Sequence, residues 1–324
     1  MSSNRLDAAG AAHLIAESDS ILVFYHVSPD GDCIGSTLGM VHALKKAGKR
    51  VQAVGADPVP RIYDYMPGCD TLFVPWAEVE GEWDLALILD CGDLDRVGAA
   101  LPVVRKAKRT LNVDHHITND AFGDDNYLDF TAAATGELVY LIIRELGVPV
   151  DFHIATCLYT AIAADTGGFK YDNSAPRTFR IAADLVEAGA RPYEIASAIW
   201  ENESMARLSL LSQALSTLQV DPTGQIAWIS VTREMLDRTG ASEEDVDGLV
   251  NYARKVAGVE VGLLFRECPD GRVRCGLRSR RQVDVGTIAK QFGGGGHARA
   301  AGCGVGTDIE EARHQVLSAV RAVI

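Results

Sequence analysis

Short apolar runs alternate with helix-like segments along the first half of the chain. Four such runs are separated by turn-rich segments, at residues 21–25, 51–54, 85–89 and 110–113. The longest two, ILVFY and LALIL, are typical of strands buried on both faces of a parallel sheet. Helical spacing begins at Ser36 and again at Thr135, which we expect to cap a helix that ends at Gly147. This alternation predicts a doubly wound parallel sheet.

The second half of the chain has a different pattern. Leucines at helical spacing between Pro192 and Leu218 predict a connecting helix. Further along, Ser242 and Asp245 form a capping-box pattern ahead of an expected helix. Strands are predicted at residues 226–231, 259–267 and 273–279. We therefore expect an α/β protein with a catalytic domain at 1–191, a helical linker at 192–218 and a smaller α/β domain at 219–324.

Composition narrows the class of protein. The chain has 324 residues, of which 47% are hydrophobic, and its formal net charge of −13 argues against binding to long duplex nucleic acid or to a membrane through bulk charge. The seven cysteines are scattered and form no CxxC pair, as is usual for reduced thiols. The N-terminus lacks a signal-peptide pattern, and no apolar run approaches the ~20 residues of a membrane span. We expect a cytoplasmic protein.

Charged residues collect where the predicted strands end. The segment HVSPDGDCIGS follows the first apolar run and carries His26, Asp30 and Asp32, while Asp90 directly follows LALIL. The other members of this set are Asp114, His115 and His116, after the strand at 110–113, and Asp165, where an apolar helix gives way to glycines. The carboxyl ends of parallel strands share one edge, which is where open α/β sheets bind ligands. We therefore expect these side chains to share one site, which Asp165 joins if its segment packs against this edge.

This set of residues favours a metal site. Its carboxylates cannot share a pocket without compensating charge, because each raises the pKa of the others. With His26 and His115 they form a mixed oxygen and imidazole set, which suits Mn²⁺ or another octahedral divalent ion, and one bridging carboxylate would give enough ligands for two ions. Taken alone, each residue also has an ordinary structural interpretation, and an aspartate such as Asp90 after a buried strand is often a cap or turn residue.

Four segments in this order resemble the motifs of the DHH phosphoesterases: HVSPDGD, LILDCGD, VDHH and AADTGGF. The segment FGGGGHARAAG, residues 292–302, is similar to the glycine-rich signature of the DHHA1 domain. Among the members of the family, the chain looks most like the small nanoRNases, which act as oligoribonucleases and pAp phosphatases. The resemblance implies a DHH domain followed by a DHHA1 domain, with the active site in the cleft between them.

The resemblance also implies a role for each residue of the set. One Mn²⁺ would be held by His26, Asp30 and Asp90, with Mg²⁺ or Co²⁺ as possible replacements. The second ion would share Asp90 as a bridge and would be held further by Asp32, His115 and Asp165. His116 would stabilise the scissile phosphate or protonate the leaving oxygen, and Asp114 would orient the histidine pair.

The last third of the chain contains a basic segment, although the chain as a whole is acidic. Eight basic residues lie between Arg266 and Arg299, and only three acidic residues oppose them. The glycine run from Gly293 to Gly296 allows backbone N–H groups to approach a phosphate, as in a nest or at a helix N-terminus. By resemblance to the family, the expected substrate-binding residues are Arg278, Ser279, Gly295, Gly296, His297 and Arg299.

The sequence therefore predicts a two-metal hydrolase that cleaves dinucleotides such as pApA to mononucleotides and pAp to AMP, with cyclic di-AMP as a possible further substrate. A homodimer is implied by the family alone. Two alternatives stay open: an inorganic pyrophosphatase of family II, which shares the metal motifs, and a nucleotide-binding sensor without turnover. Tyr171, Trp200 and Tyr252 could stack a base, but such residues are more often part of a core.

Overall fold

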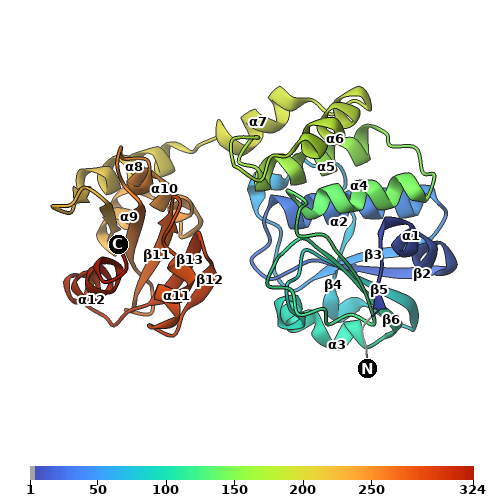
Figure 1. Ribbon diagram of the computed structural model, residues 1–324, viewed down its shortest axis with the longest axis horizontal. Coiled ribbons are helices and arrows are strands. Elements are labelled where there is room, and N and C mark those ends of the chain that lie inside the picture. Colours follow the sequence, from blue (N-terminus) through green and yellow to red (C-terminus); the bar gives the residue numbers. More distant parts are fainter. Residues whose placement is uncertain (1–3) are drawn as a thin grey trace. The chain divides into compact units, whose positions relative to one another are not determined.

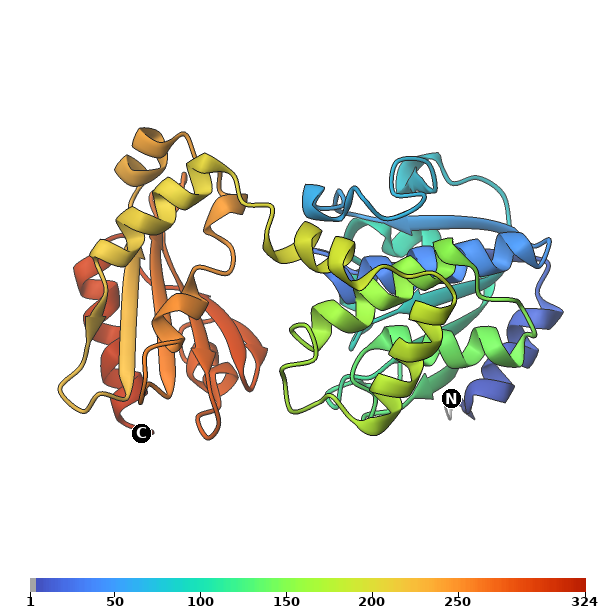
Figure 2. The same ribbon diagram turned by 90° about the horizontal axis from the view of Figure 1, so that it is seen from above.

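The computed structural model describes residues 4–324, apart from the side chain of His297, and the chain divides into two compact units, Met1–Asn202 and Glu203–Ile324 (Figure 1, Figure 2). Each unit has its own sheet and its own hydrophobic core. The expected domain limits at residues 191 and 218 lie on either side of this division, and the three-part division of the chain stays a prediction.

The N-terminal unit is built on a sheet of seven parallel strands in the order β1-β7-β6-β5-β2-β3-β4. These strands are β1 (Asn4–Arg5), β2 (Ser20–Phe24), β3 (Arg50–Gly55), β4 (Phe73–Pro75), β5 (Trp83–Leu89), β6 (Ala107–Asp114) and β7 (Asp125–Leu128). The chain runs outward from β2 to β4 and then returns to β5, beside β2. This reversal of strand order is the point at which open α/β sheets bind ligands. The predicted doubly wound parallel sheet is confirmed.

Helices cover both faces of this sheet (Figure 1). They are α1 (Ala8–Glu17), α2 (Gly31–Lys46), α3 (Leu101–Val104), α4 (Thr135–Glu145), α5 (Phe152–Asp165), α6 (Pro176–Glu187) and α7 (Pro192–Trp200). In β5, Leu85 and Leu87 join the core under α2, α4 and α5, whereas Trp83 and Ile88 join the core under α3. The strand is buried on both faces, and its wholly apolar sequence therefore predicted its position correctly.

Helix α2 begins at Gly31 rather than at Ser36, the start that the sequence pattern predicts. Asp30 caps the helix by accepting a hydrogen bond from the Cys33 N–H (3.0 Å). Two glycines hid the first turns of the helix in the sequence, because glycine is a weak helix former. The fold requires glycine at one of them, Gly35, because a Cβ there would lie 2.4 Å from the Cys157 carbonyl oxygen of α5.

Two other helix predictions need correction. Ala134, and not Thr135, occupies the N-cap position of α4, and the Thr135 hydroxyl has a different partner, described below. The segment expected to form a connecting helix between Pro192 and Leu218 instead forms two helices, α7 and α8 (Met205–Ser216), with non-helical residues between them.

The C-terminal unit contains a six-stranded mixed sheet in the order β12-β13-β11-β10-β9-β8. Its strands are β8 (Gln219–Val220), β9 (Ile226–Val231), β10 (Val261–Glu267), β11 (Val273–Ser279), β12 (Gly295–His297) and β13 (Ala300–Gly304). Its helices are α8, α9 (Arg233–Thr239), α10 (Val250–Arg254), α11 (Val285–Lys290) and α12 (Ile309–Arg321). The predicted smaller α/β domain is thus confirmed, although Ser242 and Asp245 frame only a short 3₁₀ turn, Glu244–Val246.

Candidate metal centre

The acidic and histidine residues predicted at the strand ends of the N-terminal unit come together beside the reversal point of its sheet. His26 follows β2 and Asp90 follows β5, and these two strands are neighbours. Asp90 has a left-handed backbone (φ 59°), which is unfavourable for a residue with a side chain and is common at functional sites. His26 Nε2 lies 3.4 Å from Asp90 Oδ2.

Asp32 is the most firmly held carboxylate of the centre. It lies in the first turn of α2, not in a loop as its sequence suggested, and its side chain is 1% exposed. Its oxygens accept hydrogen bonds from the backbone N–H groups of Thr135 (2.6 Å) and Gly136 (2.9 Å) and from the Ser36 hydroxyl (3.0 Å). The N-terminus of α4 therefore fixes the position of this buried negative charge.

His115 lies at the meeting point of three carboxylates. Its Nε2 atom is 3.4 Å from Asp165 Oδ2, 3.6 Å from Asp90 Oδ1 and 3.7 Å from Asp32 Oδ2. Its Nδ1 atom is 3.2 Å from the Ala132 carbonyl, and the N–H donated to that carbonyl leaves the lone pair of Nε2 directed at the carboxylates. Atoms this close, with neutral imidazole and carboxylate donors, fit a hard divalent ion.

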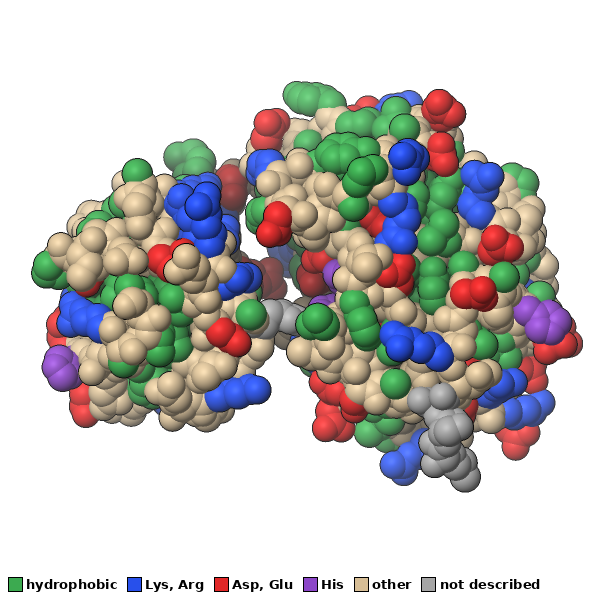
Figure 3. Space-filling view, viewed as in Figure 1, with side chains coloured by type: hydrophobic (Ala, Val, Ile, Leu, Met, Phe, Trp, Pro, Cys, Tyr) green, Lys and Arg blue, Asp and Glu red, His purple; other side chains and the backbone are tan. Residues whose placement is uncertain are grey.

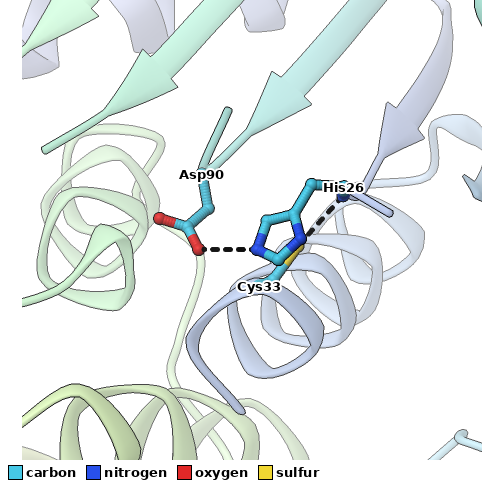
Figure 4. Close-up of side chains that lie close together, drawn as sticks. All are labelled: His26, Cys33 and Asp90. Carbon is cyan, nitrogen blue, oxygen red and sulfur yellow. Dashed lines mark hydrogen bonds and ion pairs between the residues drawn. The ribbon is translucent and has the colours of Figure 1, made fainter. Parts of the chain in front are cut away.

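His26, Asp30 and Asp90 form the other half of the centre. Nδ1 of His26 lies 2.8 Å from the Val27 carbonyl, so that its Nε2 is the ring atom turned toward Asp90 (Figure 4). Asp30 Oδ1 is 3.9 Å from the same Nε2, and the Asp30 side chain is 58% exposed. Because one oxygen of Asp90 faces His26 and the other faces His115, this carboxylate has the geometry of a bridge between two metal positions.

Cys33 completes a buried cluster with His26 and Asp90 (Figure 4). Its sulfur accepts a hydrogen bond from the His26 backbone N–H (3.2 Å). Burial, followed by the charge of Asp90, raises the pKa of this thiol well above its usual range. A neutral thiol is a poor ligand for a hard cation, and we therefore assign Cys33 to packing beneath the His26 ring.

A hydrogen-bonded chain supports His116. Asp114 is fully buried and its Oδ1 lies 2.7 Å from His116 Nδ1. Asn119, which the sequence analysis missed, donates from its amide to Asp114 Oδ2 (2.6 Å) and to the Cys91 carbonyl (2.9 Å). Burial lowers the pKa of His116, but the hydrogen bond that His116 donates to Asp114 and the charge of Asp90 outweigh it and raise the pKa to about 9. In the metal-free protein this shift favours the protonated form of His116 at neutral pH.

The carboxylates of the centre are driven to different protonation states. Burial raises the pKa of Asp165 to about 7, with His115 opposing the shift and Asp90 adding to it. Burial, then Asp90 and Asp165, raise the pKa of Asp32 well above its usual range. Burial has the same tendency for Asp90, but the hydrogen bond from His26 and the charges of His116 and His115 hold its pKa below its usual range. Protons thus balance negative charge here that divalent cations would otherwise balance.

Two polar residues after α5 tie these elements together. Arg177 donates from Nε to Glu137 Oε2 (2.8 Å) and from Nη1 to Asp129 Oδ2 (2.7 Å), and Glu137 is a buried residue in the first turn of α4. Asn173 donates to the carbonyl oxygens of Ala133 (3.1 Å) and Asp165 (3.2 Å). These bonds fix the start of α4 relative to the end of α5, and hence Asp32 relative to Asp165.

The sequence analysis assigned Thr135 to the wrong partner. Its hydroxyl donates to Asp90 Oδ1 (2.9 Å), so one residue holds Asp90 through its side chain and Asp32 through its backbone. A Thr-Gly pair after the small residues Ala132–Ala134 was the only sequence signal of this contact. Neither Arg177 nor Asn173 has a sequence signal, because their partners are distant in the chain.

The expected substrate-binding residues of the C-terminal unit lie around one end of β11. Arg278 and Ser279 end this strand, and Ser279 donates to the carbonyl oxygens of Arg299, from its N–H (3.1 Å), and Ala298, from its hydroxyl (3.2 Å). Arg299 Nη1 donates to the Val283 carbonyl (3.1 Å). The side chain of His297 lies outside the described part of the chain.

The second half of the glycine run forms a strand. Gly295 and Gly296 belong to β12, which pairs with β13. A Cβ on Gly296 would lie 2.5 Å from the Ala300 carbonyl oxygen, so close strand packing requires glycine there. On the face seen in Figure 3, basic and acidic side chains are interspersed over both units. Within residues 4–324, no helix is both long and apolar enough to cross a membrane.

Comparisons with known proteins agree with this architecture. Residues 20–162 match the DHH family, N-terminal domain, and residues 225–324 match the DHHA1 domain. The chain is 36% identical to a protein of Thermus thermophilus named bifunctional oligoribonuclease and PAP phosphatase NrnA, over 95% of this chain and 91% of that protein. A Bacillus subtilis protein of the same name is 24% identical over 89% of this chain and 90% of its own length.

A solved structure has the same fold. It is an exopolyphosphatase-related protein from Bacteroides fragilis, 27% identical, with a TM-score of 0.92 over 97% of this chain and 95% of that chain. The chain thus belongs to the DHH phosphoesterases that carry a DHHA1 domain, a family of metal-dependent hydrolases.

Proposed function

We propose that this protein hydrolyses short oligoribonucleotides, such as pApA, to mononucleotides and pAp to AMP, with two Mn²⁺ ions bound in the N-terminal unit. The observation that carries this proposal is the position of Asp90, which has one carboxylate oxygen facing His26 and the other facing His115. The names of the Thermus thermophilus and Bacillus subtilis relatives support this choice of substrates. Cyclic di-AMP is a further candidate substrate.

Each residue of the centre has a separate role in the proposed reaction. One ion is held by His26, Asp30 and Asp90, and the other by Asp32, Asp90, His115 and Asp165. Divalent ions in such a pair supply Lewis-acid activation of a water molecule and neutralise charge on the phosphoryl group. His116, protonated and oriented by Asp114, donates a hydrogen bond to the phosphoryl oxygen or a proton to the leaving oxygen.

The C-terminal unit supplies the nucleotide-binding residues of the proposal. Arg278 and Arg299 are cations suited to a terminal phosphate, with Ser279, Gly295, Gly296 and His297 around them. We also expect this unit, residues 219–324, to act as the substrate-binding domain, the segment 192–218 to link it to the catalytic domain at 1–191, and the protein to form a homodimer.

The test is a hydrolysis panel with purified protein stripped of metal and then supplied with Mn²⁺, Mg²⁺ or Co²⁺. The substrates are pApA, pAp, cyclic di-AMP and pyrophosphate, and the products are separated by chromatography. We expect AMP from pApA and pAp with Mn²⁺, and intact pyrophosphate. The variant Asp90→Asn should be inactive, whereas Asp93→Asn, a nearby change at a helix cap, should retain activity. Rapid pyrophosphate cleavage with inert nucleotides, or nucleotide binding without turnover with any metal, would overturn the proposal.

A further inference from the structure

A strained turn follows the last carboxylate of the metal centre. Three consecutive residues after Asp165 and Thr166 have a left-handed backbone: Gly167 (φ 57°), Gly168 (φ 71°) and Phe169 (φ 64°). Such a conformation is unfavourable for phenylalanine, and strain of this kind collects at functional sites. The turn therefore has a purpose beyond connecting α5 to the next segment.

The two glycines of this turn make room for two aromatic rings. A Cβ on Gly167 would lie 2.4 Å from the Tyr171 ring, and a Cβ on Gly168 would lie 3.2 Å from the Trp200 ring. Both rings therefore pack on bare backbone. They are nevertheless well exposed, Tyr171 by 49% and Trp200 by 40%. The structure thus rules out the core position that such residues usually occupy.

The rings are anchored to the backbone beside a metal-ligand candidate. The Tyr171 N–H donates to the Thr166 carbonyl (3.1 Å), one residue after Asp165. Lys170, directly before Tyr171 in the sequence, places its Nζ atom 5.6 Å from the centre of the Trp200 ring. In the described part of the chain, no carboxylate lies within ion-pair distance of this ammonium group. Two exposed aromatic rings, and a lysine that contacts one of them, therefore lie around the turn that directly follows Asp165.

We propose that Tyr171 and Trp200 form a stacking subsite for a nucleobase of the substrate, with Lys170 beside it to interact with the nucleotide phosphate. This inference rests on the proposed function, because it assigns a place to the base of a nucleotide whose phosphate reaches the metal centre. Stacking on aromatic rings tolerates any base, since every base has a π face. The subsite favours nucleotides over phosphate compounds that lack a base and accepts purines and pyrimidines.

A binding experiment tests the subsite without turnover. AMP is titrated into the metal-free full-length protein, and tryptophan fluorescence and calorimetry are recorded together. Of the other three tryptophans, Trp83 and Trp228 are buried and Trp76 is partly buried, so the quenching that Trp200→Leu removes reports on stacking at Trp200. We expect Trp200→Leu to lose most of the quenching and to weaken AMP binding about tenfold, equivalent to ~1.4 kcal/mol. Trp200→Phe should restore most of the affinity.

The control is Tyr193→Ala on the same helix α7, at a ring that is 77% exposed and distant in sequence from the strained turn. It should bind AMP as the unaltered protein does. Equal loss of affinity in Tyr193→Ala and Trp200→Leu, or no loss in Trp200→Leu, would overturn the subsite.

A kinetic experiment separates this inference from the proposed function. Dinucleotides with an abasic ribose in place of one nucleoside are compared with pApA. For Trp200→Leu we expect KM for pApA to rise about tenfold, with kcat nearly unchanged. For the abasic dinucleotide that lacks the stacked base, we expect the same KM as with the unaltered protein. If pApA is hydrolysed but Trp200→Leu changes KM for both substrates equally, the subsite is wrong while the proposed function stands. If pApA is not hydrolysed at all, the proposed function fails, whereas the AMP titration still tests the subsite.

Discussion

The metal centre has two unequal halves that share Asp90. On the His115 side, Asp32 is almost fully buried and receives three hydrogen bonds, two of them from the N-terminus of α4. On the His26 side, Asp30 is more than half exposed, and within the described residues its side chain accepts a single hydrogen bond, from the Cys33 N–H of the helix that it caps. The two sides therefore differ in one aspartate each: Asp32 is built into the fold, whereas Asp30 lies at its surface.

This difference shows that two aspartates of one site can be held in different ways, one by the interior of the fold and one at its surface. A buried carboxylate must be matched by hydrogen bonds or cations, and the fold supplies three hydrogen bonds for Asp32. An exposed carboxylate such as Asp30 keeps its hydration, so its position costs little folding free energy. It can also release a bound metal ion readily. We expect an ion on the His115 side to bind more tightly than an ion on the His26 side.

The largest expected effect is that of Asp32→Asn. An amide keeps the size of the side chain but loses the charge and cannot accept all of the present hydrogen bonds. Hydrolysis of pApA should fall by about 10³-fold or more, which corresponds to ~4 kcal/mol of lost stabilisation. Steady-state kinetics at saturating Mn²⁺ measure this, and retention of a tenth of the activity would contradict the assignment.

Arg177→Met should affect the His115 side and the stability of the fold. It leaves Glu137 buried without its partner, which typically costs ~3–5 kcal/mol, and loosens the start of α4. The free energy of unfolding, measured with urea, and the affinity for Mn²⁺ should both decrease. The control Arg144→Met removes an exposed pair from the other end of α4 and should cost less than about 1 kcal/mol. Equal losses in both variants would refute the positioning role of Arg177.

Asp30→Asn should have a smaller effect on the centre. Asparagine caps a helix as well as aspartate does, so α2 should stay intact. We expect a 10–100-fold loss of affinity for one Mn²⁺ only, a size typical of changes at the edge of metal sites. Calorimetric titration with Mn²⁺ should show one unchanged and one weakened step, and the loss of both steps would show that the two halves are not independent.

The smallest effect concerns pH. The pKa of Asp165 in the folded protein is about 7, above its value of ~3.9 in the unfolded chain, so the folded state binds more protons between these values. The stability of the metal-free protein should therefore fall as pH rises from about 4 to about 7. Urea midpoints at several pH values measure this slope. Asp165→Asn should flatten it, and an unchanged slope would contradict the shift.

The N-terminal sheet and its converging residues could be predicted from the sequence for one physical reason. Strands that are apolar throughout must be buried on both faces, and the residues that follow parallel strands must meet at one edge. His26, Asp90 and His115 come together for this reason. The start of α2 was missed because Gly31 and Gly35 weaken the helical pattern, although packing against α5 requires Gly35.

Contacts between distant segments could not be predicted in the same way. Thr135 is suitable as a helix cap by its residue type, and only the fold shows that its hydroxyl reaches Asp90. The residue types of Arg177 and Asn173 do not reveal their partners, because these lie far away in the chain, at the start of α4 and at the end of α5. In the C-terminal unit, the glycine run predicts a phosphate-binding loop, and the sequence did not show that Gly295 and Gly296 pair with β13.

The central claim is that Asp90 bridges two metal ions, and Mn²⁺ titration followed by electron paramagnetic resonance tests it most directly. The metal-free protein should bind two Mn²⁺ per chain, and the second ion should produce the spin coupling of ions ~3.5–4 Å apart. Asp90→Asn should abolish this coupling, while Asp93→Asn should keep it. Binding of a single ion, or of two uncoupled ions that Asp90→Asn leaves unchanged, would contradict the account.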